Sequence, residues 1–376
     1  MSTVIKVMHC ISDTNFGGAG RVLLNYLSHF NQKIYDVTVV LPKGSKLLGY
    51  MDPTVYKIIE FDGLYDRSFD RGDVKKLKKL IQKIKPDIVH SHGALSARIA
   101  GKQCGCKVVY TRHSVFDLPR WQTSGFGKLL LGGINSHYAD RIIAVSPAAK
   151  TLLIDSGTPA DKIDVIFNGV EAVVRADEEQ NIQTRQRFGL SSDAFICSII
   201  ARLEEVKGHK YVIEAAKILK DRGVKDVRIL IAGAGGIEEE LKSYARQLDV
   251  TDVVCFTGFI KEIDQLLSVT DLQLNASYGT EATSMALLEG FSLGIPAAVS
   301  NFGGNPFVVA DEENGLIFAK KDAKALCDAL LRLKEDTALY QKTKLGALQS
   351  FHAKFTAQKM TEGMEALYVD LIEGSK

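Results

Sequence analysis

The 376-residue sequence lacks the features that mark several specialised classes of protein. It has no apolar run near the ~20 residues that a membrane-spanning helix needs, and its first residues turn polar too early for a signal peptide. Its formal net charge is only +2, whereas a nucleic-acid-binding protein normally carries a larger basic excess. Its six cysteines include no CxxC motif, which favours reduced thiols over a zinc site. We therefore expect a cytoplasmic protein that binds no nucleic acid.

The sequence does contain the composition and the strand-helix alternation of an α/β protein. Apolar residues make up 46% and charged residues 24%, close to the average for globular domains, and the length suits two domains of somewhat more than ~150 residues. Short β-branched runs alternate with amphipathic stretches, which predicts parallel sheets covered by helices. The predicted strands form two series, 4–10, 37–41, 87–90, 107–111, 141–145 and 164–167, then 194–201, 227–232, 253–257, 271–276 and 296–300. Among the predicted helices are 20–30, 74–84 and 147–156.

A polar segment separates the two series and predicts a domain boundary. Asn168-Gly169 is a turn signal, and residues 171–183 are polar and acidic with no strand pattern. Near the C-terminus, residues 353–372 repeat apolar side chains at the three- and four-residue spacing of a helix. We predict two parallel-sheet domains facing each other across a cleft, residues 1–170 and 171–352, followed by a helical tail, 353–376.

Ligands of such open sheets bind beyond the carboxyl ends of the strands, so the loops that follow the strands hold the candidate sites. After the first strand, Gly17-Gly18 opens a helix whose N-terminus favours an anion. The loop fits neither the GxGxxG pattern of dinucleotide-binding proteins nor a P-loop, and a simple tight turn explains it equally well. His90, His92 and His113 lie at the ends of two neighbouring strands. They have no carboxylate or cysteine companion at a suitable spacing and do not indicate zinc.

In the second series, two cations follow the first strand. Arg202 and Lys207 at a strand end suit a diphosphate, the arginine through its planar fork and the lysine as a point charge. Because Glu204 lies between these two cations, an ordinary solvated loop explains the charges just as well.

Two glutamates bracket the start of a predicted helix near Thr283. Eight residues of helix rise about 12 Å, so Glu281 and Glu289 are separated by a length comparable to that between the sugar and the ribose of a nucleotide sugar. The first helical N–H groups, near Thr283 and Ser284, would lie between the two carboxylates and suit a diphosphate. An amphipathic helix with one capping and one exposed glutamate is the structural alternative.

Taken together and in order, Gly17-Gly18, Asn168-Gly169-Val170, Arg202…Lys207 and Glu281-x7-Glu289 resemble the retaining GT-B glycosyltransferases of family 4, also called glycosyl transferases group 1. The resemblance covers nearly the whole chain. It implies two Rossmann-like domains and a C-terminal helix that crosses back to the N-terminal domain. It also implies a hexosyltransferase that moves a sugar from a UDP- or GDP-sugar to a hydroxyl of a growing glycan or a lipid-linked sugar, with no catalytic metal and no cofactor.

The resemblance implies a role for each candidate residue. The C-terminal domain would bind most of the nucleotide-sugar donor, and the N-terminal domain would bind the acceptor. The implied catalytic residues are His113 beside the donor sugar, Arg202 and Lys207 on the diphosphate, and Glu281 at the sugar hydroxyls. The implied donor-binding residues are Gly17 and Gly18 over the phosphates, Gly258 and Phe259 at the base, Thr283 and Ser284 at the helix N-terminus, and Glu289 on the ribose hydroxyls.

Three positions depart from the family's pattern. Ala282-Thr283-Ser284 follows the first glutamate where the family commonly has Gly-Phe-Gly, so we expect a different sugar selectivity. Phe307 stands where the family often carries glutamate, and Glu171 where aspartate is common.

Two further segments concern the acceptor. The loop after His113 contains Arg120 and Trp121, the only tryptophan, and it suits either an acceptor sugar or a packed surface loop. Residues 71–85 carry seven basic residues against one acid. This pattern suits either a peripheral contact with the inner face of a membrane or the solvated face of a half-buried helix.

Three other functions fit the same sequence. A nucleotide-sugar epimerase or a phosphorylase of related fold would share the architecture, and a catalytically silent nucleotide-sugar-binding protein would share the site. The pairs Glu281 with Glu289 and Arg202 with Lys207 favour an enzyme over the silent protein.

Overall fold

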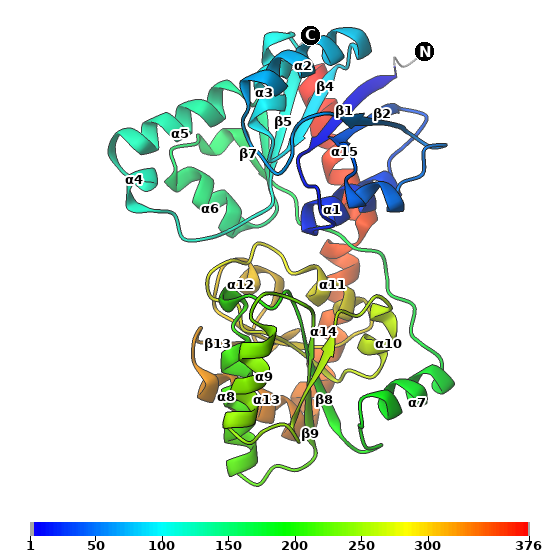
Figure 1. Cartoon of the computed structure of the whole chain (residues 1–376), viewed down its shortest axis with the longest axis vertical. Coiled ribbons are helices and arrows are strands. Elements are labelled where there is room, and N and C mark those ends of the chain that lie inside the picture. Colours follow the sequence, from blue (N-terminus) through cyan, green and yellow to red (C-terminus); the bar gives the residue numbers. More distant parts are fainter. Residues whose placement is uncertain (1–3, 375–376) are drawn as a thin grey trace. The chain divides into compact units, whose positions relative to one another are not determined.

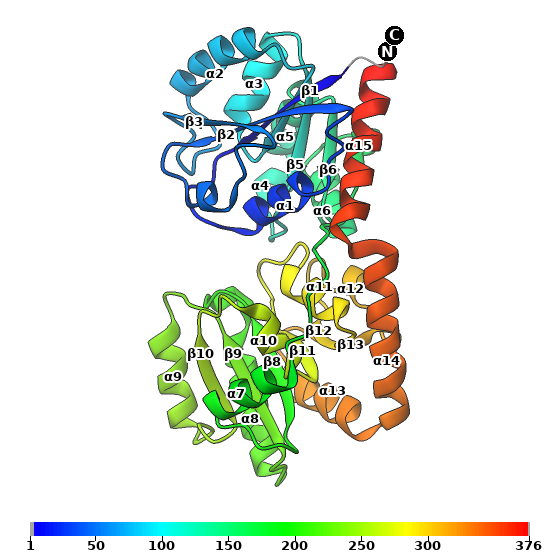
Figure 2. The same ribbon diagram turned by 90° about the vertical axis from the view of Figure 1, so that its right-hand side faces the viewer.

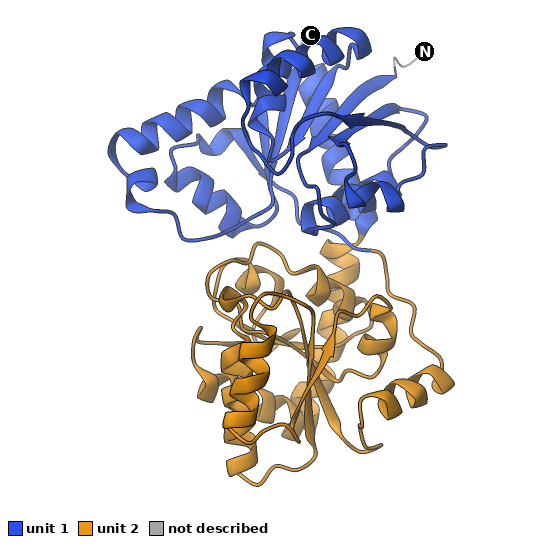
Figure 3. Cartoon of the chain, viewed as in Figure 1, with its two compact units in different colours: residues 1–170, 357–376 blue, residues 171–356 orange. Residues whose placement is uncertain are grey.

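Two compact α/β units make up the chain, of which the computed structural model describes residues 4–374 (Figures 1 and 3). Unit 1 comprises residues 1–170 and 357–376, and unit 2 comprises residues 171–356. The tail of unit 1 begins at Ala357 and not at residue 353, because Phe351–Phe355 forms a π-helical turn that belongs to unit 2. The side chains of Phe351 and Phe355 are both 1% exposed, so this turn is held in the core of unit 2.

Unit 1 is a parallel sheet of seven strands in the order β3-β2-β1-β4-β5-β6-β7. Its strands are β1 Ile5–Ile11, β2 Tyr35–Pro42, β3 Lys57–Phe61, β4 Ile88–His92, β5 Lys107–Arg112, β6 Arg141–Ala144 and β7 Ile163–Val165. Its helices are α1 Gly18–Leu27, α2 Arg71–Ile84, α3 Leu95–Gln103, α4 Arg120–Thr123, α5 Gly125–His137, α6 Pro147–Asp155 and α15 Ala357–Glu373. Helices α2 and α3 lie side by side over the face that carries Met8 and Cys10 of β1 (Figure 2). Helices α1 and α15 contact the other face, which carries His9.

Unit 2 is a parallel sheet of six strands in the order β10-β9-β8-β11-β12-β13. Its strands are β8 Phe195–Ile200, β9 Val227–Ala232, β10 Val254–Gly258, β11 Leu272–Asn275, β12 Ala297–Ser300 and β13 Gly315–Phe318. Its helices are α7 Glu178–Arg187, α8 His209–Asp221, α9 Glu238–Gln247, α10 Ile263–Ser268, α11 Met285–Ser292, α12 Asn305–Val308, α13 Ala323–Glu335 and α14 Thr337–Ser350. The apolar side chains of α8, α9 and α13 share one core with the strands, and those of α10 share a second core on the other face.

The predicted strands all exist, with ends within two residues of those predicted. Strands β3 and β13 were not predicted, because both are short edge strands and β3 carries the exposed residues Lys57 and Glu60. Helix α7 lies partly in the segment predicted to lack a strand pattern. It is polar on nearly every side, and a capping box between Asp177 and Gln180 starts it.

The C-terminal helix α15 completes unit 1, as predicted. Its residues Met360, Met364 and Tyr368 are buried against this unit. The backbone N–H of Asn31 donates to Glu365 at 2.8 Å, and Arg141 and Asp370 form an ion pair at 2.7 Å. These contacts join residues more than 200 positions apart in the sequence.

Both sheets reverse their strand order beside their first strand, between β1 and β4 in unit 1 and between β8 and β11 in unit 2. In open α/β sheets, ligands bind beyond the carboxyl ends of the strands at such a reversal point. The loops after these strands contain most of the predicted site residues.

Candidate active site

Lys207 and Glu281 meet at the reversal point of unit 2. Lys207 ends a short 3-10 turn after β8, and Glu281 lies in the loop after β11. The Nζ atom of Lys207 lies 3.1 Å from Oε2 of Glu281 and donates to the carbonyl oxygen of Thr280 at 2.9 Å. The two side chains are only 14% and 8% exposed, so this is a buried pair rather than a screened surface contact.

Two neutral side chains that the sequence did not single out complete the surroundings of Glu281. Asn275 Nδ2 and Ser277 Oγ donate to Oε2 of Glu281 at 3.1 and 3.2 Å. Together with Lys207, three donors therefore converge on one carboxylate oxygen. Both residues lie at the end of the predicted strand 271–276, and that position is the signal that could have identified them.

Two glycines fix the backbone beside Glu281. The N–H of Gly304 donates to the carbonyl oxygen of Glu281 at 2.9 Å. A Cβ atom at Gly303, which has a φ of 59°, would lie 2.2 Å from that same oxygen, and one at Gly304 would lie 1.6 Å from the carbonyl oxygen of Ala282. Any side chain here would displace the loop, so the glycines hold Glu281 in place.

Helix α11 begins at Met285 and not near Thr283. Ser284 is the N-cap, and its Oγ accepts from the N–H of Leu287. The first free N–H positions of the helix therefore belong to Met285 and the residue after it, two residues later than predicted. Thr283 and Glu289 are 7% and 6% exposed, so the alternative of an ordinary helix with one exposed glutamate does not hold.

Arg202 is not part of the buried cluster. Its guanidinium pairs with Glu204 at 2.6 Å, and its side chain is 70% exposed. The structure therefore separates the two predicted cations, because Lys207 turns toward Glu281 while Arg202 faces solvent beside an acid.

Gly258 and Phe259 lie at the carboxyl end of β10, an edge strand of unit 2. Gly258 has a φ of 71°, a conformation that favours glycine. The phenylalanine side chain that follows it is 75% exposed.

Gly17 and Gly18 lie at the reversal point of unit 1. Gly17 is the N-cap of α1, and its φ of −110° suits any residue. A Cβ atom at Gly18 would meet no atom within 4 Å. A tight turn therefore does not require these glycines, and the open space before the helix N-terminus allows close approach of an anion.

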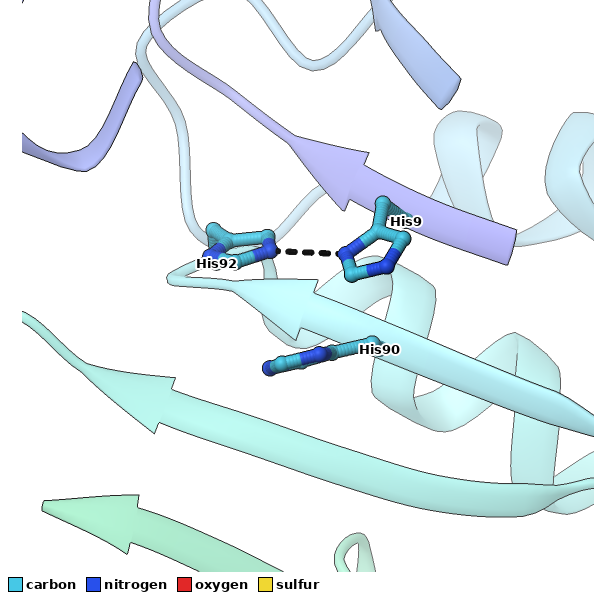
Figure 4. A group of neighbouring side chains, drawn as sticks. All are labelled: His9, His90 and His92. Atoms are coloured by element: carbon cyan, nitrogen blue, oxygen red, sulfur yellow. Dashed lines mark hydrogen bonds between the residues drawn. The ribbon is translucent and has the colours of Figure 1, made fainter. Parts of the chain in front are cut away.

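His113 follows β5 and belongs to a row of hydrogen-bonded histidines. Its Nε2 lies 2.9 Å from Nδ1 of His92, and Nε2 of His92 lies 3.1 Å from Nδ1 of His9 (Figure 4). Burial lowers the pKa of His9 to about 3 and, with help from Arg112, that of His113 to about 4. Sequence reasoning missed His9 because it lies inside the first predicted strand and not at its end.

Arg120 and Trp121 are the first two residues of the short helix α4 and are both exposed, Trp121 to 57%. The ring of Trp121 covers Gly127 of α5, where a Cβ atom would come within 2.7 Å of it. On either side of Gly127, α5 exposes Phe126, Leu129 and Leu130 by 79%, 74% and 46%.

Helix α2 contains most of the predicted basic segment. Val74, Leu77 and Ile81 are buried, and the exposed residues in 71–85 are charged or polar apart from Gly72, with no large apolar side chain among them. Within residues 4–374, no helix combines the length and the apolar character needed to cross a bilayer.

Solved structures with the same arrangement of elements define the fold class. Anabaena HepE in complex with UDP superposes with a TM-score of 0.83 at 19% identity, covering 97% of this chain and all of that one. A glycosyltransferase from Rickettsia africae gives a TM-score of 0.82 at 21% identity, covering 98% of this chain and 99% of the other. The protein therefore has the GT-B fold of glycosyltransferases.

Family comparison then identifies the particular group. The model described as "Glycosyl transferases group 1" matches residues 180–348, and that described as "Glycosyltransferase Family 4" matches residues 16–173. The chain belongs to glycosyltransferase family 4, and it transfers a sugar from a nucleotide sugar.

Two curated relatives extend over almost the whole chain. The UDP-Gal:alpha-D-GlcNAc-diphosphoundecaprenol alpha-1,3-galactosyltransferase of Escherichia coli is 26% identical, covering 98% of this chain and 97% of its own length. The N-acetyl-alpha-D-glucosaminyl L-malate synthase of Bacillus anthracis is 24% identical and covers 96% of each chain.

Proposed function

We propose that this enzyme is a retaining glycosyltransferase that moves a hexose from a UDP-sugar to a hydroxyl of a lipid-linked or growing glycan. The buried Lys207–Glu281 pair at the reversal point of unit 2 carries the proposal, because it unites a phosphate-binding cation and a hydroxyl-binding carboxylate. The choice of UDP is supported by HepE, solved with UDP and with UDP-glucose. The name of the E. coli relative supports both a UDP-sugar donor and a lipid-linked acceptor.

Unit 2 would hold the donor along the carboxyl edge of its sheet. Lys207 has three N–H donors, and Glu281 and Thr280 occupy two of them, so the third can reach a phosphate oxygen. Arg202 can release Glu204 and bind the second phosphate of the diphosphate instead. All three donors to Glu281 reach Oε2, which leaves Oε1 to accept from a sugar hydroxyl.

The other predicted site residues of unit 2 would make the remaining contacts with the nucleotide sugar. Glu289 would accept from the ribose hydroxyls, while Thr283, Ser284 and the first N–H groups of α11 would face the diphosphate. Phe259 is an exposed aromatic ring that suits the base, with Gly258 allowing the chain to turn there.

Unit 1 would act on the acceptor side. The N–H groups after Gly17 and Gly18 would cover the phosphates, and His113 would lie beside the transferred sugar. Arg120 and Trp121 are exposed and would contact the acceptor.

We propose that the reaction needs no metal, because Lys207, Arg202 and the N-terminus of α11 can balance the charge on the leaving diphosphate. The acceptor oxygen would form its bond to the anomeric carbon on the face from which the phosphate oxygen departs. That phosphate oxygen would take the acceptor's proton, so the configuration is retained and the protein supplies positioning.

Replacing Lys207 tests the proposal. Lys207→Ala should lower kcat about 100-fold or more, as loss of a preorganised charge contact does, while circular dichroism stays unchanged. Lys217→Ala, which removes an exposed lysine of α8 paired with Asp221, is the matched control and should keep full activity. Near-normal activity of folded Lys207→Ala would refute the assignment of this site.

The donor and the reaction class need a separate experiment. UDP-, GDP- and ADP-sugars are screened by thermal shift, and we expect the UDP-sugars to raise the melting temperature by mass action. With an acceptor present, a glycosyltransferase releases UDP, whereas an epimerase would interconvert the sugar without any acceptor. A silent binding protein would show the thermal shift and no turnover.

We further propose a peripheral contact with the inner face of an anionic membrane, which places the enzyme in the cytoplasm. The exposed lysines of α2 supply the charge that was expected from residues 71–85, and Phe126, Leu129 and Leu130 of α5 supply the apolar anchors. The segment 118–139 around these anchors contains Arg120 and Lys128 and no acidic residue.

Flotation with vesicles of anionic lipid separates the two surfaces. Lys75→Gln/Lys79→Gln should weaken binding mainly at low salt, and Phe126→Ser/Leu129→Ser should weaken it at every salt concentration. If the unmodified protein fails to float with these vesicles at low salt, the membrane proposal is wrong.

A further inference from the structure

The loops that follow β1 and β2 of unit 1 carry a stacked pair of aromatic rings. Phe16 precedes the two glycines of the first loop, and Tyr50 ends a 3-10 turn, Lys46–Tyr50, that follows β2. The two ring centroids lie 4.3 Å apart, with an interplanar angle of 17°. Tyr50 is 57% exposed and Phe16 is partly exposed. Because Phe16 covers one face of the tyrosine ring, the other face is open to a ligand.

Hydrogen bonds hold these two loops together without help from the rings. Ser45, which is buried, donates through Oγ to the carbonyl oxygen of Asp13 at 2.9 Å. The N–H of Lys46 donates to the carbonyl oxygen of Thr14 at 3.0 Å, and the next residue, Leu47, is fully buried. A ring pair that leaves one ring mostly in water adds little apolar burial to this arrangement. A ligand therefore explains the position of the pair better than stability does.

Two carboxylates belong to the same group of loops, and their surroundings differ. The carboxylate of Asp66 accepts from the N–H of Thr14 at 2.9 Å and from the Thr14 hydroxyl, which ties the loop after β3 to the first loop. The carboxylate of Asp13 makes no hydrogen bond or ion pair within residues 4–374. Its Oδ2 lies 3.5 Å from the place that a Cβ atom at Gly17 would take. Burial and the neighbouring Asp66 raise the pKa of Asp13.

An open aromatic face and a carboxylate without a partner are complementary to a sugar ring. The C–H groups on one face of a pyranose suit an aromatic ring, whose face carries partial negative charge. The two oxygens of a carboxylate can accept from two neighbouring hydroxyls. The charge of Asp13 repels an anion, so a neutral sugar fits here better than a phosphate does. The loops also lie at the reversal point of unit 1, where open sheets bind ligands.

We propose that Tyr50, supported by Phe16, and Asp13 form the subsite for the acceptor sugar, a neutral pyranose whose hydroxyl receives the transferred hexose. The assignment of this sugar to the acceptor rests on the proposed function. The pyranose stacks on the open face of Tyr50, and Asp13 accepts from two of its hydroxyls. Arg120 and Trp121 follow β5, and β4 lies between β1 and β5 in the sheet, so these two residues contact a further part of the acceptor.

Sugar binding can be measured without the donor, by saturation-transfer NMR on the full-length protein. The probes are the methyl glycosides of glucose, galactose and N-acetylglucosamine at millimolar concentration, with the aromatic protons of the protein saturated. We expect at least one glycoside to receive saturation on the C–H groups of one ring face. Tyr50→Ala should abolish this transfer, and Trp121→Ala should keep it. Transfer to none of the three glycosides, or transfer that persists in Tyr50→Ala, would overturn the proposal.

Steady-state kinetics test the role in the reaction, with the donor that the thermal screen selects and the glycoside that binds. Tyr50→Ala should raise the KM of the acceptor about 10-fold and leave the KM of the donor unchanged. Tyr50→Phe keeps the ring and should restore the acceptor KM. Asp13→Asn should also raise the acceptor KM, because an amide has one accepting oxygen where a carboxylate has two.

The matched control is Phe69→Ala, which removes an aromatic side chain of similar exposure, 50%, from the loop after β3. It should leave both KM values unchanged. If it raises the acceptor KM as much as Tyr50→Ala does, the effect comes from the loops and the subsite is refuted. An unchanged acceptor KM in folded Tyr50→Ala refutes the subsite and leaves the proposed function intact. If the glycosides bind as expected but no UDP-sugar is turned over, the proposed function fails and the sugar subsite stands.

Discussion

At the scale of single residues, Lys207 and Glu281 balance each other's charge where water is largely excluded. Removing one partner of such a buried pair leaves the other uncompensated, at about 3–5 kcal/mol, whereas removing both leaves no charge behind. We therefore expect Lys207→Met to destabilise the protein more than the double variant Lys207→Met/Glu281→Gln does. Urea unfolding of the two single variants and the double variant measures the coupling. Additive losses would show that the two charges do not depend on each other.

Residue positions could be predicted better than residue orientations. Lys207 and Glu281 were identifiable because charged side chains at strand ends stand out in the sequence. Nothing in the sequence showed that Lys207 turns toward Glu281 while Arg202 pairs with Glu204. The neutral donors to Glu281 and the buried His9 were missed because serine, asparagine and a lone histidine are common in ordinary strands and loops.

At the scale of secondary-structure elements, α15 is attached to the sheet of unit 1 through a buried polar contact. The hydroxyl of Tyr368 lies 2.5 Å from Nδ1 of His90, and both residues are fully buried. Tyr368→Phe keeps the aromatic ring but leaves that nitrogen without its partner. We expect a loss of about 1–3 kcal/mol in the free energy of unfolding, measured by urea denaturation. Tyr211→Phe, in a ring pair with Tyr278 in unit 2, is the control, and an equal effect there would contradict this account.

Most elements with a buried apolar face were predictable, and those that bury little were not. The central strands of both sheets are mostly buried, so their apolar runs mark them in the sequence. Edge strand β3 and the polar helix α7 bury too little to leave such a pattern, whereas β13 is mostly buried but only four residues long. The start of α11 was misplaced by two residues because both Thr283 and Ser284 are good N-cap residues.

At the scale of the whole molecule, the buried histidines are distributed unequally. Burial lowers the pKa of His9, His90, His92 and His113 in unit 1, and in unit 2 burial and the nearby Lys207 lower that of His209 to about 4. Consider a histidine that stays neutral in the native state but has a pKa near 6.5 in the unfolded state. Above pH 6.5 this histidine leaves the free energy of unfolding unchanged. Stability is lost as the pH falls from about 6.5 toward 4, by about 2 kcal/mol at pH 5 for each such histidine.

We therefore expect acid to weaken unit 1 before unit 2. Hydrogen exchange of the full chain at pH 7 and pH 5, corrected for intrinsic rates, should show a larger loss of protection in peptides from residues 4–170 than in those from 171–356. A uniform loss, or an earlier loss in unit 2, would show that the histidines do not govern acid stability.

Because α15 belongs to unit 1 but is encoded at the opposite end of the chain, the two units cannot be completed in the order in which they are synthesised. Unit 2 is continuous in sequence and can close as soon as it leaves the ribosome. Unit 1, although translated first, must wait for Tyr368 and its neighbours to reach the ring of His90. A premature stop codon near the end of the gene would therefore damage the beginning of the protein.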